Sequence, residues 1–117
     1  MYEMTVHYME LNPTPFDLIK NNIKTIELRL YDEKRKNIRI GDMICFTQIE
    51  TGETLYRKVE QLHIFESFTQ VYKKLDLLKC GYTLTNINDA SHKDMELYYT
   101  KEEQLLWGVV GIELINV

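Results

Sequence analysis

Three polar side chains alternate with apolar ones in segment 24–31, and their types can recognise or transform a polar ligand. Thr25, Glu27 and Arg29 occupy every second position, with isoleucine or leucine between them. In a β-strand such residues point to one face, about 6.5–7 Å apart. A carboxylate there accepts a hydrogen bond from an exocyclic amine, and a guanidinium holds a phosphate or a carbonyl edge. The alternative is a solvent-exposed face with a weak Glu27–Arg29 ion pair, worth about 0–1 kcal/mol.

Lys24 precedes this polar face and is in phase with the apolar side of the strand. We expect it at the mouth of the strand, where its aliphatic stem packs and its ammonium group reaches out. As a functional residue it neutralises charge on a ligand or, if desolvated, acts as a base. The alternative is one surface lysine among many.

The densest positive cluster follows in the charged segment 32–37. It comprises Lys34, Arg35 and Lys36, with Arg39 close behind, and two acidic residues partly cancel it. We interpret this segment either as a solvated loop or as a nucleic-acid contact loop beside the polar face. The net charge of −4 argues against a protein that coats a duplex, because phosphate contacts supply most of that affinity. A small basic cleft is still compatible, since charges are screened within about 8 Å at physiological salt.

Cysteine and histidine do not form a metal-binding pattern. Cys45 and Cys80 are isolated, and no histidine has a second histidine or a cysteine one helical turn away, so we expect neither a metal nor a cofactor. Cys45 lies in an apolar segment, which favours a core position over a nucleophile. No Ser-His-Asp arrangement is visible. His7 is interpreted as a partly buried, hydrogen-bonded side chain, with a cleft donor as the alternative.

Aromatic residues are frequent, with 8 tyrosines and 1 tryptophan. Most are expected in the core or at the rim of a sheet, as is usual for aromatic residues at strand and helix spacing. Tyr82 and Tyr99 each follow a turn or a helix end, and are the better candidates for stacking on a base.

The elements that position these residues follow from hydrophobic periodicity and capping signals. Strands are predicted over 4–11, 24–31, 43–49, 54–65 and 108–117, with a short β-type segment at 38–40. Helices are predicted over 16–21, 68–78 and 92–99, with one or two further turns from a capping box at Thr100–Glu103 and another capping box at Ser67–Gln70. A sheet of consecutive antiparallel strands hides its edges most economically by closing into a small barrel.

The length of 117 residues predicts a single domain, residues 1–117. The hydrophobic fraction of 44% is too high for intrinsic disorder. The longest apolar run is far shorter than a membrane span, and residues 1–5 lack the basic and apolar regions of a signal peptide. We therefore expect a cytoplasmic protein that has no membrane partner.

The segment 24–42 also carries a resemblance to a known family. Its residues resemble the core signature of the ASCH domain, a family of the PUA-like superfamily of small β-barrels. The resemblance covers nearly the whole chain in order, through 24–30, 32–35, 40–42, Gly81-Tyr82, 95–99 and 108–114. It implies an α+β fold: a small PUA-like β-barrel of mixed or antiparallel strands with two to four short helices.

What the resemblance implies about function is a cleft that binds RNA or a modified nucleoside or nucleotide. The signature lysine of the family corresponds to Lys24, its acidic strand residue to Glu27 and its arginine to Arg29. The full set of candidate ligand-binding residues is Lys24, Thr25, Glu27, Arg29, Lys34, Arg35, Tyr82 and Tyr99.

The resemblance leaves two other functions open. Relatives include a small bacterial amidohydrolase that deacetylates N4-acetylcytidine, so the alternative is a hydrolase that cleaves such an amide or cuts RNA. In it, Lys24 would be a base or an electrostatic clamp, and Glu27 a general acid–base. That enzyme, however, has threonine, its proposed nucleophile, at the position of Glu27, and Asn22 stands where relatives commonly have glycine. The third function is an adaptor that binds only protein.

Overall fold

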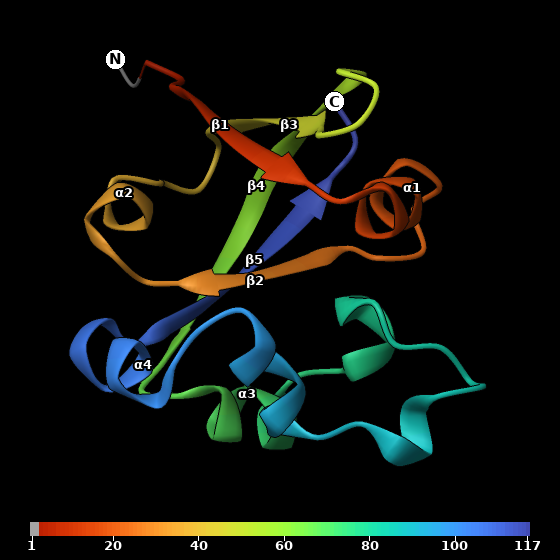
Figure 1. Ribbon diagram of the computed structural model, residues 1–117. Helices are drawn as coiled ribbons and strands as arrows, with labels where there is room; N and C mark the ends of the chain where they lie inside the picture. Colours follow the sequence, from red (N-terminus) through yellow and green to blue (C-terminus); the bar gives the residue numbers. More distant parts are fainter. Residues whose placement is uncertain (1–2) are drawn as a thin grey trace.

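A curled, mixed sheet of five strands forms the centre of the molecule (Figure 1). The computed structural model describes residues 3–117, so the first two residues of the predicted domain lie outside it. The strands are β1 (Val6–Leu11), β2 (Ile26–Leu30), β3 (Met43–Gln48), β4 (Thr54–Phe65) and β5 (Val109–Ile115). Together with several short helices they confirm the predicted α+β class.

The strand order is β1-β3-β4-β5-β2, with β1 parallel to β3 and the other pairs antiparallel. The expectation of consecutive antiparallel strands is therefore wrong for β1 and β2, which pair with strands distant in sequence. These two strands are the edges of the sheet, which curls into a half-barrel. Helix α1 (Pro13–Lys20) connects them, and it begins earlier than predicted because Pro13 is accepted in a first helical turn.

Strand β2 is buried on both faces, and this decides the setting of its charged residues. Glu27 pairs with Ile112 and Arg29 with Val110, and directly paired residues point to the same face of a sheet. Ile112 and Val110 belong to the core cluster inside the half-barrel. The charged face of β2 therefore points into the half-barrel, and its apolar face packs against the helices.

Those helices lie on the opposite side of β2 from β1 and α1 (Figure 1). They are α3 (Phe68–Lys74), the 3₁₀ helices η1 (Leu77–Cys80), η2 (Ile87–Asp89) and η3 (His92–Leu97), and α4 (Lys101–Trp107). Phe68 and Val71 of α3 form a second core cluster with the apolar face of β2. Helix α3 ends before residue 78, the predicted end, because Leu75 is already extended with ψ 154°.

Two capping signals have different outcomes. Thr100 accepts from the backbone N–H of Glu103, and the Glu103 side chain accepts from that of Thr100, so this capping box is confirmed. The predicted box at Ser67 is wrong, because its side chain makes no capping hydrogen bond. Gln70 instead accepts from the backbone N–H of Glu66.

The charged segment after β2 also differs from its predictions. Its residues 33–36 form the short helix α2 (Glu33–Lys36), which begins where the Asp32 side chain accepts from the backbone N–H of Arg35. The following segment 38–40 is not a strand, although Ile38 is buried in the inner core cluster. Within residues 3–117, no helix combines the length and the apolar character needed to cross a bilayer.

Gly111 lets the outer helical layer approach β5, and its substitution tests that packing. A Cβ atom at this position would lie 2.8 Å from Leu75 Cδ1 and 3.2 Å from Ile26 Cγ2. We expect Gly111→Ala to lower the free energy of unfolding by about 1–3 kcal/mol, measured by urea denaturation. In a double-mutant cycle with Leu75→Ala, the loss from Gly111→Ala should shrink, since the nearest clashing atom is gone. Additive losses would contradict this explanation.

Candidate functional site

A buried carboxylate held by two cations is the centre of the candidate site. Glu27 is 3% exposed. Its Oε1 lies 2.7 Å from Lys24 Nζ, and its Oε2 accepts from Arg29 Nε at 2.9 Å and lies 2.8 Å from Arg29 Nη2. We call Lys24, Glu27 and Arg29 the ion triad. The alternative of a weak, solvent-exposed pair is therefore wrong, because this charged cluster is largely excluded from water.

The electrostatics of the ion triad keep Glu27 ionised. Burial by itself would raise the pKa of this carboxyl group. The positive charges of Lys24 and Arg29, with the hydrogen bonds that they donate, outweigh burial and hold the pKa of Glu27 below its ordinary value. Burial opposes the charged form of Arg29 as well, but Glu27 and the Tyr99 hydroxyl raise the pKa of Arg29. Both groups are therefore charged at neutral pH.

Arg29 also bridges the open side of the half-barrel. Its Nη2 donates to the backbone carbonyl of Glu10 on β1 at 2.9 Å. Lys34 acts similarly, donating from Nζ to the carbonyl of Tyr8 at 2.6 Å. Side chains from β2 and α2 thus satisfy carbonyl groups along β1, an edge strand of the sheet.

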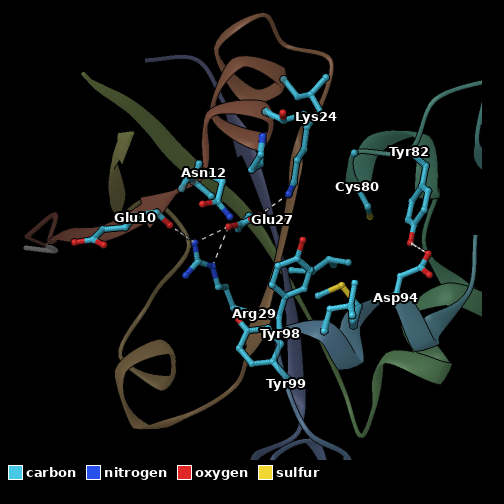
Figure 2. A pocket seen from close by; sticks show the side chains of 18 of the residues that line it. Glu10, Asn12, Lys24, Glu27, Arg29, Cys80, Tyr82, Asp94, Tyr98 and Tyr99 are labelled. Atoms are coloured by element: carbon cyan, nitrogen blue, oxygen red, sulfur yellow. Dashed lines mark hydrogen bonds and ion pairs between the residues drawn. The ribbon is translucent and has the colours of Figure 1, made fainter. Parts of the chain in front are cut away.

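The ion triad forms one wall of a cavity of about 660 Å³ (Figure 2). Glu10, Asn12 and the α1 residues Thr14, Pro15 and Leu18 extend that wall. The opposite wall comes from the helical layer, through Cys80, Gly81, Tyr82, Asp94, Met95, Leu97, Tyr98 and Tyr99. Segments far apart in the sequence therefore meet around one space that is charged on one side and rich in aromatic groups on the other.

Gly81 holds the Lys24 side chain against β2. It follows η1 with φ +110°, a left-handed conformation that favours glycine. A Cβ here would lie 3.4 Å from Lys24 Cδ, so the lysine stem fits closely against the glycine backbone. The predicted packing of the stem is confirmed, but the ammonium group turns inward to Glu27. Burial raises the pKa of the neighbouring Cys80 to about 12, so this thiol is protonated at neutral pH.

Tyr82 is part of a hydrogen-bonded chain on the helical wall. Its hydroxyl lies 2.6 Å from that of Tyr72 and donates to Asp94 Oδ2 at 2.6 Å. Burial and the hydrogen bond to Asp94 raise the pKa of Tyr82 above its ordinary value. Asp94 also accepts from the backbone N–H of Ser91 and so caps η3. The chain ties η3 to α3 and sets the position of the wall.

Two adjacent tyrosines of the cavity differ in their exposure. Tyr99, a predicted candidate, lies in the cavity wall and stacks on Phe68 with ring centroids 5.9 Å apart. Tyr98, which sequence reasoning missed, also lines the cavity but is 64% exposed. The sequence signals for Tyr98 were its place in a helical stretch that ends before a capping box and in the segment 95–99 of the family resemblance, and neither distinguished it from Tyr99.

Three predicted residues do not line the cavity. Thr25 is engaged through its backbone, donating to the carbonyl of Lys79 and accepting from the N–H of Leu114 at 2.8 Å each. Lys34 contacts the β1 edge, and Arg35 forms an ion pair with Asp32 at 2.9 Å. That these three residues contact a ligand therefore stays a prediction from the sequence.

The isolated histidine and cysteine of the sequence lie elsewhere. His7 contacts Asp42 Oδ2 at 2.8 Å outside the cavity, as expected for a partly buried, hydrogen-bonded side chain. Cys45 is buried in β3. Among residues 3–117, no group of three or more His, Cys, Asp or Glu side chains is arranged to hold a metal ion.

Comparison with known proteins identifies the family. The family model described as the ASCH domain matches residues 9–117, which is most of the chain. The chain belongs to the ASCH domain family. No curated protein sequence matches this ASCH domain.

Solved structures agree with this assignment. The domain is similar to the crystal structure of hypothetical protein PH0355, with 33% identity and a TM-score of 0.82 over 97% of this chain and 100% of the other. It is also similar to the solution structure of protein PF0455 from Pyrococcus furiosus, with 33% identity and a TM-score of 0.71 over 94% and 96% of the two chains. An ASCH protein from Zymomonas mobilis shares the fold, at 12% identity and a TM-score of 0.63, over 97% of this chain and 69% of that chain. The predicted PUA-like α+β fold is confirmed.

The lowered pKa of Glu27 predicts how stability depends on pH. A carboxylate with a lowered folded-state pKa stabilises the fold above its unfolded pKa, near 4.5, and this contribution is lost as pH falls through the folded value. We expect Glu27→Gln to lower the free energy of unfolding at pH 7 by about 3 kcal/mol or more, because both cations lose their buried partner. The difference from wild type should shrink below pH 4.5, as measured by urea denaturation between pH 3 and 7.

Glu113→Gln is the matched control for this measurement. The Glu113 side chain lies 3.2 Å from His63 and is 28% exposed, so its loss should cost no more than about 1 kcal/mol. Equal destabilisation by the two substitutions at pH 7 would contradict a special role for the buried ion triad.

Proposed function

We propose that this ASCH domain binds the nucleoside part of RNA, or of a modified nucleotide, in the cavity beside the ion triad. The observation that carries the proposal is the ion triad itself, which places fixed charges on one wall of a cavity whose opposite wall is rich in aromatic groups. A cavity of about 660 Å³ lies within the usual range for small-molecule sites. The family is generally thought to bind RNA.

The ion triad retains hydrogen-bonding capacity for a ligand. An ammonium group has three N–H donors, and that of Lys24 uses one on Glu27. A carboxylate offers about four acceptor positions. In Glu27 the contacts from Lys24 and Arg29 take three of them. Donors and an acceptor that lie side by side suit the edge of a base, which presents both kinds of group.

The same electrostatics favour recognition over hydrolysis. A carboxyl group whose pKa is lowered stays ionised at neutral pH, so Glu27 has no proton to give as a general acid and is a weak base. The Cys80 thiol, with its pKa raised to about 12, is not a nucleophile at neutral pH. These two observations support a binding site over the hydrolase alternative.

The binding proposal predicts a specific effect of Lys24. The protein is titrated at low salt, by thermal shift and calorimetry, with ribonucleosides, their 5′-monophosphates, modified nucleosides and short RNA. At least one of these ligands should raise Tm, because binding stabilises the folded state. We expect Lys24→Met to weaken binding about tenfold or more, since a charged donor is lost while the stem can still pack on Gly81.

Lys20→Met is the matched control for Lys24→Met. Lys20 also contacts a glutamate, Glu53, at 2.6 Å, but it lies outside the cavity. Its substitution should leave affinity within about twofold of wild type. The proposal fails if no nucleoside, nucleotide or RNA raises Tm, or if both substitutions weaken binding equally.

A second measurement separates binding from hydrolysis. We expect purified protein to leave N4-acetylcytidine and short RNA intact over long incubation, because the ionised Glu27 cannot act as a general acid. Chromatography of the nucleoside and gel analysis of the RNA detect turnover. Release of cytidine that disappears in Glu27→Gln would overturn this expectation and favour the hydrolase.

A further inference from the structure

An exposed apolar rim extends the cavity beyond the ion triad. Leu97 and Tyr98 both line the cavity, yet they are 84% and 64% exposed. They are consecutive residues at the end of η3. A ligand confined to the cavity would leave most of this apolar surface in water, whereas a larger ligand that crosses the rim would cover it.

The Tyr98 ring is available for stacking. Among the described residues, the two aromatic pairs are Phe68 with Tyr99 and Tyr72 with Tyr82, and Tyr98 belongs to neither. The neighbouring Tyr99 is packed into the wall, while Tyr98 is beside the same space in the close view (Figure 2). A planar group that leaves the cavity therefore meets an aromatic ring at its mouth.

The four cations that the sequence predicted as ligand contacts are already engaged within the protein. Lys24 and Arg29 hold Glu27, Lys34 contacts the carbonyl of Tyr8, and Arg35 is paired with Asp32. A ligand that depended on many phosphate contacts would have to displace partners from these side chains, apart from Lys24, which keeps spare N–H donors. Stacking on an aromatic ring requires no such displacement, and it is tolerant of base identity.

We propose that the cavity receives one base of a single-stranded RNA and that Tyr98 stacks on the adjacent base. This inference rests on the proposed function and names its substrate class as a strand, in preference to a free nucleoside. Leu97 adds apolar contact at the same crossing point. The ion triad then recognises one nucleotide, and the rim provides additional affinity for its neighbour.

The test compares tetranucleotides with single nucleotides. Wild-type protein is titrated with the four homopolymeric RNA tetranucleotides and with the matching 5′-monophosphates, and the ratio of the two affinities is the readout. We call this ratio the strand advantage. For the base that the cavity accepts, Tyr98→Ala should reduce the strand advantage about 5- to 150-fold, the range found for single base–aromatic stacks. Tyr98→Phe should retain that advantage, because the stacking face is kept.

Tyr8→Ala is the matched control, since Tyr8 is 62% exposed and does not line the cavity. It should leave the ratio unchanged. The logarithm of the strand affinity should also fall with that of the salt concentration at a slope no steeper than about −1.4, as expected for one or two phosphate contacts on a single strand.

The outcomes separate this inference from the proposed function. If monophosphates bind and tetranucleotides bind no more tightly, the stacking proposal is wrong and the nucleoside site stands. A strand advantage that survives Tyr98→Ala, that falls equally in Tyr8→Ala, or that has a salt slope steeper than about −1.4 also overturns it, and indicates that phosphate contacts elsewhere hold the strand. If neither ligand binds, the proposed function itself fails.

Discussion

Burial of a single carboxylate constrains the whole architecture around the site. An ionised Glu27 inside the half-barrel needs compensating charge, because removing a charge from water is costly unless it is paired and hydrogen-bonded. Lys24 and Arg29 supply that charge, and each is held by another part of the chain. Gly81 supports the stem of Lys24, and the carbonyl of Glu10 binds Arg29. The carboxylate thus links β2 to the helical layer and to the opposite edge of the sheet.

This arrangement explains how a half-barrel can stay open. The edges β1 and β2 are not paired with each other, and an unpaired edge usually invites aggregation. Here Arg29 and Lys34 donate to the exposed carbonyl groups of β1. Because side chains rather than a strand bridge the gap, space remains beside it for the cavity. Both the open edge and the candidate site therefore result from the unpaired gap between β1 and β2.

The cavity combines a charged wall with an aromatic wall, and the two have different physical roles. The ion triad is preorganised, since its geometry and charge state are fixed by burial and by mutual hydrogen bonds. Such a wall presents fixed charges to the cavity without changing its own protonation. The aromatic wall is positioned by the chain from Tyr72 through Tyr82 to Asp94, which anchors η3. Tyr99 is fixed in the wall by its stack on Phe68, while Tyr98 remains in contact with solvent at the mouth.

Local signals in the sequence determined the five strands and most of the helices, and tertiary packing decided which surfaces they bury. Alternation over 24–31 predicted a strand with Glu27 and Arg29 on one face, and the capping box at Thr100 predicted the start of α4, because both signals depend on neighbouring residues alone. The ASCH signature likewise pointed to the ion triad. No local pattern could show that this polar face turns inward, since that depends on the pairing of β2 with β5, about 85 residues away by sequence number. Tyr98 was missed for the same reason: its exposure at a cavity is a property of surfaces that meet only in the folded chain.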